Sequence, residues 1–96
     1  MDYQVYYTDR SLADLEDLLD WIAKDDPRAA SRFGTALLDH VDLLGRFPRM
    51  GRAHLSRLGY REMVHGRVLV YYRIHEEARQ VEVLHFRHGS RRPAAL

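Results

Sequence analysis

The stretch "IAKDDPRAA" (residues 22–30) decides the fold, because one helical pattern ends and another begins around its "DDP". Asp26 is a preferred helix N-cap, and Pro27 is favoured at the first position of a helix. Two amphipathic helices joined by so short a link are expected to form an antiparallel hairpin. The sequence therefore predicts a helix hairpin in the first half of the chain.

Apolar residues on both sides of this link recur at helical spacing. Each set covers an arc of about 80° at ~100° per residue, which is the width of one buried face. Thr8, Asp9 or Ser11 can cap the first helix, and Ser11 and Asp14 have the spacing of a capping box. The predicted buried faces are Leu12, Leu15, Leu19 and Ile22 in the first helix, and Ala30, Phe33, Leu37, Val41 and Leu44 in the second.

Segments rich in strand-forming residues flank the hairpin. Residues 3–8 precede it, and residues 60–64, 67–75 and 80–87 follow it after a loop-like stretch at 49–59. The last three segments are joined by short turns and are therefore antiparallel. The order is β-α-α-β-β-β in one domain spanning residues 1–96. The predicted fold class is α+β, with the helix hairpin packed on one face of a small, mainly antiparallel sheet.

The run from Val68 to Tyr72 is apolar at every position, as expected of a strand covered on both faces. Two helices can cover only one face of the predicted four-stranded sheet. Either the twisted sheet buries part of its other face itself, or a partner chain covers it. Trp21 raises a similar question, because it lies almost opposite the Leu12/Leu19 stripe. It either packs against the second helix or contacts a partner.

The composition excludes several classes of protein. The chain has no cysteine, which rules out disulfides and thiolate metal sites. Its longest uninterrupted apolar run is Val68 to Tyr72, far short of a membrane span. The start, Met1-Asp2-Tyr3, enters the first strand pattern directly, without the features of a signal peptide. We expect a cytoplasmic protein with no membrane partner and no cofactor.

The net charge of +1 conceals two halves of opposite sign. Residues 1–45 hold four Lys/Arg against ten Asp/Glu, a net charge of −6. Residues 46–96 hold eleven arginines against four glutamates, a net charge of +7. The abundance of arginine can reflect a GC-rich genome. The segregation predicts that the second half attracts an acidic partner.

The sequence offers little support for direct chemistry. His85 and His88 are three residues apart, which places them on opposite faces of a strand, and no histidine spacing suggests a metal site. The serines lack the context of a nucleophile, and no glycine-rich loop opens a helix. Duplex DNA would be repelled by the two acidic helices. General acid–base work on RNA is left open with Glu62, His65, His85 or His88, whereas protein recognition meets the fewest difficulties.

Four segments, in order, give the chain a specific resemblance that covers nearly its whole length. They are "ADLEDLLDWIAKDDPRAASRF" (13–33), "LLGRFPRMGR" (43–52), "GYREMVHGRVLVYYRI" (59–74) and "VEVLHFRHGSRRPAAL" (81–96). Together they resemble the RelE/ParE superfamily of bacterial type II toxin–antitoxin toxins.

This resemblance implies one of two activities. RelE-type toxins cleave mRNA on the ribosome with a set of basic residues, whereas the ParE branch has been associated with poisoning DNA gyrase. No tyrosine follows Tyr72, so the C-terminal catalytic tyrosine has no counterpart. Val68 stands where the ribonucleases carry an essential arginine, unless Arg67 is a shifted substitute. The ending "HGSRRP" is closer to the ParE-like branch.

We therefore interpret the chain as a ParE-like toxin that inhibits DNA gyrase by binding. A RelE-type ribonuclease and a non-toxic partner in an autoregulatory complex are the alternatives. The residues expected to contact target or antitoxin are Trp21, Arg61, Arg73, His88, Arg91 and Arg92, and a ribonuclease would use Arg61, Arg67, Arg87 and His88. "HFRHGSRRP" (85–93) is then a strand end plus a contact surface, or else a solvated tail. A ParD-like antitoxin with an acidic C-terminal segment would wrap the toxin in a hetero-oligomer, and only the antitoxin would contact operator DNA.

Overall fold

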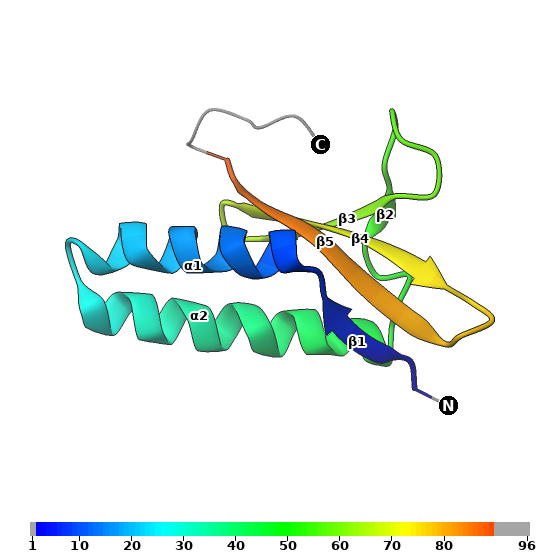
Figure 1. Cartoon of the computed structure of the whole chain (residues 1–96), viewed down its shortest axis with the longest axis horizontal. Helices are drawn as coiled ribbons and strands as arrows, with labels where there is room; N and C mark the ends of the chain where they lie inside the picture. Colours follow the sequence, from blue (N-terminus) through cyan, green and yellow to red (C-terminus); the bar gives the residue numbers. More distant parts are fainter. Residues whose placement is uncertain (1, 90–96) are drawn as a thin grey trace.

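The structure, a computed structural model, describes residues 2–89. Two helices lie side by side and pack against a twisted sheet (Figure 1). The helices are α1 (Asp9–Ala23) and α2 (Pro27–Asp42), followed by a short 3-10 turn, η1 (Leu43–Gly45). The strands are β1 (Gln4–Tyr7), β2 (Arg52–Ala53), β3 (Arg61–His65), β4 (Val68–His75) and β5 (Gln80–His88).

The sheet has five strands in the order β1-β5-β4-β3-β2. β1 pairs with β5 in parallel, and the other neighbours are antiparallel. The predicted α+β architecture and the order of its main elements are confirmed. The additional strand is β2, two residues long, which lies inside the predicted 49–59 loop and pairs with the start of β3. So short a strand carries no periodic pattern in the sequence.

Both helices begin at side-chain caps. Thr8 accepts a hydrogen bond from the backbone N–H of Ser11, which makes Thr8 the cap of α1. Asp26 accepts from the N–H groups of Arg28 and Ala29, with Pro27 at the first helical position, as predicted.

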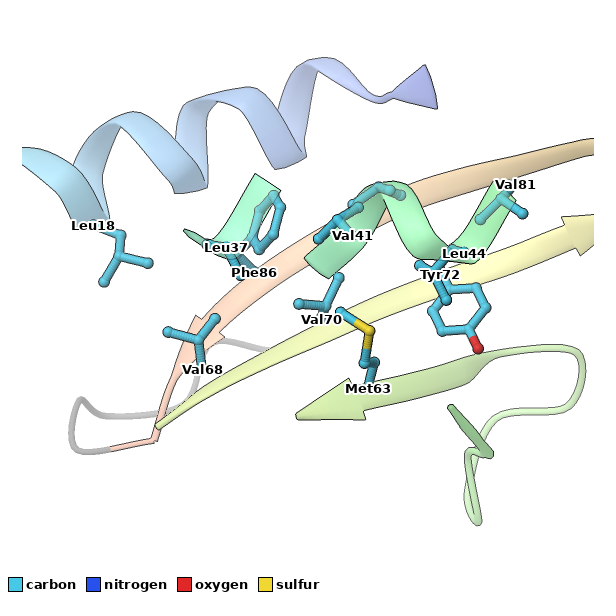
Figure 2. Packing of buried hydrophobic residues seen from close by; sticks show 11 residues of the cluster. Leu18, Leu37, Val41, Leu44, Met63, Val68, Val70, Tyr72, Val81 and Phe86 are labelled. Carbon is cyan, nitrogen blue, oxygen red and sulfur yellow. The ribbon is translucent and has the colours of Figure 1, made fainter. Parts of the chain in front are cut away.

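The core lies between the helix hairpin and the sheet (Figure 2). In α1 the prediction was partly wrong: Leu12 is 49% exposed, while Leu18 is 3% exposed and joins the core. The buried line of α1 begins at Ser11, whose hydroxyl donates to the Thr8 carbonyl oxygen, so a polar residue occupies a buried position. The central cluster is Leu18, Leu37, Val41, Leu44, Met63, Val68, Val70, Tyr72, Val81, Val83 and Phe86.

The two faces of the central strand differ in what covers them. Val68, Val70 and Tyr72 face the helices and are fully buried. Tyr71, on the opposite face, is only 2% exposed although no helix covers it. Its ring packs against His54 and stacks on His85. The single chain therefore buries Tyr71 itself, and this residue needs no partner chain to cover it.

Tyr72 ties the segment between η1 and β2 to the sheet. Its hydroxyl donates to the Pro48 carbonyl oxygen at 2.7 Å and accepts from the Gly51 N–H at 3.0 Å. A Cβ at Gly51 would lie 2.5 Å from the Glu62 carbonyl oxygen and 2.6 Å from the Tyr72 hydroxyl. The Arg61 guanidinium donates to the Gly51 carbonyl oxygen at 2.5 Å. The "FPRMGR" sequence is therefore shaped by close packing against β3 and β4.

Candidate functional site

Trp21 and His88 meet at one end of the molecule. Trp21 projects from α1 and remains 44% exposed. Its ring lies 4.9 Å, centroid to centroid, from the imidazole of His88 at the end of β5. The two residues are far apart in the sequence, and the fold brings them into one partly exposed aromatic surface. Arg91 and Arg92, which follow His88 closely in the chain, lie outside the described residues.

The other two predicted contact residues lie elsewhere. Arg73, on β4, has a side chain that is 43% exposed and lies within 3.9 Å of a Glu82 carboxylate oxygen. Its guanidinium also lies over the Tyr60 ring at 5.8 Å. Arg61 is bound to backbone oxygens of the Arg49–Gly51 segment, which gives it a structural role beside any contact. Of this set, Trp21 and His88 make a direct ring contact, whereas Arg61 and Arg73 are engaged by other groups.

The four residues proposed for ribonuclease chemistry do not converge. His88 pairs with Val68 at one end of β4, whereas Arg61 pairs with Tyr72 four positions along the same strand. At a rise of about 3.3 Å per residue, these register positions are about 13 Å apart. Arg87 follows the opposite face from His88, since successive strand residues alternate. Arg67 lies in the exposed turn between β3 and β4. A catalytic set would require these groups to meet around one phosphate.

A different polar cluster surrounds Tyr71 on the sheet face away from the helices. The His85 imidazole Nδ1 is hydrogen-bonded to the Asp14 carboxylate, which also accepts from the Phe86 N–H at 3.2 Å. Arg87 donates to the Tyr71 hydroxyl at 3.4 Å. The His85 Nε2 atom and the Arg87 Nε atom are buried without a hydrogen-bond partner. Asp14 was expected in a capping box, but its carboxylate is instead hydrogen-bonded to two consecutive residues of β5, His85 and Phe86.

This cluster could not be predicted from the sequence, because Asp14 and His85 are separated by 71 residues and meet only through the tertiary fold. His85 itself was a candidate acid or base. Its pairing with a carboxylate resembles the arrangement that orients a catalytic imidazole, but here the imidazole is only 4% exposed.

Two further histidines join α2 to the edge of the sheet. The Nδ1 atoms of His40 and His65 are 2.8 Å apart, and Phe33 packs edge-on against His65. Burial, together with the neighbouring His40, lowers the pKa of His65 below its ordinary value of 6.5. A cavity of about 460 Å³ adjoins His40 and lies between β2, β3 and the segment before β2. Its lining residues are His40, Met50, Gly51, Arg52, Glu62, Met63 and Val64.

Residues 2–89 contain no group of three or more His, Cys, Asp or Glu side chains that could hold a metal ion. No helix in this part of the chain is long and apolar enough to cross a membrane.

Comparison with known proteins adds a family and a shared fold. Residues 5–93 match the family model of the ParE toxin of the type II toxin–antitoxin system parDE. The chain is 36% identical over 69 residues to "Toxin RelE2" of Caulobacter vibrioides, covering 72% of this chain and 78% of that protein. Its fold is similar to a chain of the toxin–antitoxin complex RelBE2 from Mycobacterium tuberculosis, with 25% identity, a TM-score of 0.66, and coverage of 92% of this chain and 99% of that chain. It is also similar in fold to a chain of the chromosomal ParDE system from P. aeruginosa, with 16% identity, a TM-score of 0.76, and coverage of 90% and 95%.

Proposed function

Because the chain belongs to the family of ParE toxins of type II toxin–antitoxin systems, we propose that it inhibits DNA gyrase by binding it. The finding that carries this proposal is the contact between Trp21 and His88. An exposed tryptophan beside a histidine provides a large, amphipathic anchor of the kind that dominates protein interfaces. The basic residues Arg91 and Arg92 follow at once in the sequence.

The separation of the ribonuclease candidates supports binding over catalysis. Arg61 and His88 pair with β4 residues that are four positions apart, Tyr72 and Val68, and Arg61 donates to backbone oxygens. These positions do not form a shared phosphate site. A binding surface has no such requirement, since its contacts can be spread over the protein.

The second partner is an antitoxin. The solved relatives include chains from toxin–antitoxin complexes, and this chain is a toxin of the same kind. We propose a ParD-like antitoxin whose acidic C-terminal segment orders on the arginine-rich half, which carries a net charge of +7 in residues 46–96. The complex would be a cytoplasmic hetero-oligomer that reaches operator DNA through the antitoxin.

The test is a DNA gyrase supercoiling assay with purified, antitoxin-free protein, run beside mRNA cleavage on translating ribosomes. We expect gyrase inhibition with intact mRNA. Replacing Arg91 and Arg92 together by alanine should weaken inhibition, and the melting temperature of the variant shows whether it is still folded. Replacing Arg28 and Arg32 of α2 by alanine is the matched control, since it removes the same charge from the acidic half. Full inhibition by the Arg91/Arg92 variant would separate the tail from the target surface.

Ribosome-dependent mRNA cleavage is the second candidate, favoured by the cluster around Tyr71. His85, Arg87 and His54 bring imidazole and guanidinium groups together on one sheet face. The relative named Toxin RelE2 points in the same direction. Cuts at codon positions in the wild type, lost in His54→Ala, would replace the gyrase proposal with this one.

A further inference from the structure

The loop between β2 and β3, residues 54–60, extends away from the helix hairpin (Figure 1). It carries two leucines whose side chains contact nothing that shields them: Leu55 is 97% exposed and Leu58 is 103% exposed. Single exposed leucines are common on protein surfaces. Two fully exposed leucines in one short loop indicate a contact surface only if the loop is held in that conformation.

Hydrogen bonds within the loop hold it. The His54 N–H donates to the Tyr60 carbonyl oxygen at 2.8 Å and closes the base of the loop. The Tyr60 N–H donates to the Arg57 carbonyl oxygen at 3.2 Å, and the Ser56 N–H donates to the His54 ring at 3.2 Å. Gly59 has a φ of +83°, a conformation that suits glycine and reverses the chain. Three N–H groups of the loop are thus hydrogen-bonded within the loop, while the two leucine side chains remain exposed.

The loop is also attached to the sheet. The His54 ring lies 5.5 Å from the ring of Tyr71, which is buried. The Tyr60 ring lies beneath two guanidinium groups, that of Arg57 at 5.4 Å and that of Arg73 at 5.8 Å. A loop fixed at its base and along its length loses little conformational entropy when it binds, which favours affinity.

The chemistry around the leucines defines the partner. Residues 46–61 contain five arginines and no aspartate or glutamate. The loop is therefore an apolar tip on a basic base, and it fits an apolar pocket rimmed by carboxylates. A convex tip needs a concave surface, which a folded protein supplies and a disordered tail does not. This chain's own cavity is lined by one carboxylate, Glu62, which is already paired with Arg52, so a second copy offers no rim of carboxylates to the loop.

We propose that Leu55 and Leu58 insert into an apolar, acid-rimmed pocket on the folded protein that this toxin inhibits. This inference rests on the proposed function in taking the target to be a folded protein. It adds a second anchor to the target surface, apart from Trp21 and His88.

The test compares a double variant, which carries both Leu55→Ser and Leu58→Ser, with the control variant Ser56→Ala in the same loop. Ser56 lies between the two leucines, so its replacement alters the loop without removing apolar surface. We expect the double variant to need about tenfold or more protein for equal gyrase inhibition, because two apolar anchors are lost. Ser56→Ala should match the wild type, and both variants should melt as the wild type does. Unchanged inhibition by the double variant would overturn the inference.

A second readout separates this inference from the choice of target. If the wild type arrests growth without inhibiting gyrase, the proposed function fails, and growth arrest becomes the readout for the loop. Loss of growth arrest in the double variant would then support the inference. Undiminished growth arrest in the double variant would overturn it. A wild type with neither effect overturns both. Light scattering measures the oligomeric state and so tests the remaining alternative, a second copy of this chain. A wild-type dimer that is lost in the double variant would mean that the loop binds a second copy, which would overturn the inference.

Discussion

Replacing Tyr72 by phenylalanine tests the contact that holds the Pro48–Gly51 segment. The Tyr72 side chain is fully buried, and its hydroxyl is hydrogen-bonded to two backbone groups, the Pro48 carbonyl and the Gly51 N–H. Phenylalanine keeps the ring and leaves both backbone groups without this partner. Each unsatisfied buried group costs about 1–3 kcal/mol. Since Pro48 is only partly buried, we expect a total loss of about 2–4 kcal/mol in the free energy of unfolding.

Urea unfolding measured by circular dichroism gives this free energy directly. Tyr60→Phe is the matched control, because the Tyr60 ring packs beneath Arg57 and Arg73 and phenylalanine preserves that packing. The control should change stability by less than about 0.5 kcal/mol, as surface substitutions usually do. If Tyr72→Phe lost no more than Tyr60→Phe, the hydroxyl would not hold the segment, and the reasoning would be refuted.

Three further predictions concern packing and pH. Gly51→Ala should destabilise the protein by about 1–3 kcal/mol or more, because the added Cβ would overlap the backbone and the Tyr72 hydroxyl. Gly34→Ala should cost less, since its Cβ meets only the flexible end of the Leu19 side chain at 3.2 Å, and the melting temperatures of the two variants test this difference. Leu37→Ala should cost about 2–5 kcal/mol and Leu12→Ala much less, and equal losses in urea would contradict the observed core. The pKa of His65 is lowered by burial and by His40, so its contribution to stability is full above pH 6.5 and decreases as the pH falls through the lower folded-state pKa. His65→Gln should therefore flatten stability between pH 7.5 and pH 5, and an equally steep loss would point to other groups.

Local sequence patterns predicted most of the fold, because the signals for helices and hairpins lie within a few residues of each other. Asp26-Pro27 marked the link, and its cap formed as expected. The observed buried face of α1 differs from the predicted one because Ser11, although polar, is buried, and its hydroxyl donates to the Thr8 carbonyl oxygen. The arrangement of site residues could not be derived from the sequence. Contacts such as that between Trp21 and His88 depend on how the helix hairpin sits on the sheet.

The parallel pairing of β1 with β5 joins strands that are far apart in the sequence. Gln4 pairs with Gln80 and Tyr7 with Val83, so β1 cannot form its pairing before β5 has been synthesised. Pairings this distant in sequence form late, because a long loop must close before they stabilise anything. During translation the sheet therefore stays incomplete until β5 has left the ribosome. A nascent toxin that has exposed β1 to β4 but not β5 lacks the strand that lies between β1 and β4 in the sheet, so β1 has no strand to pair with.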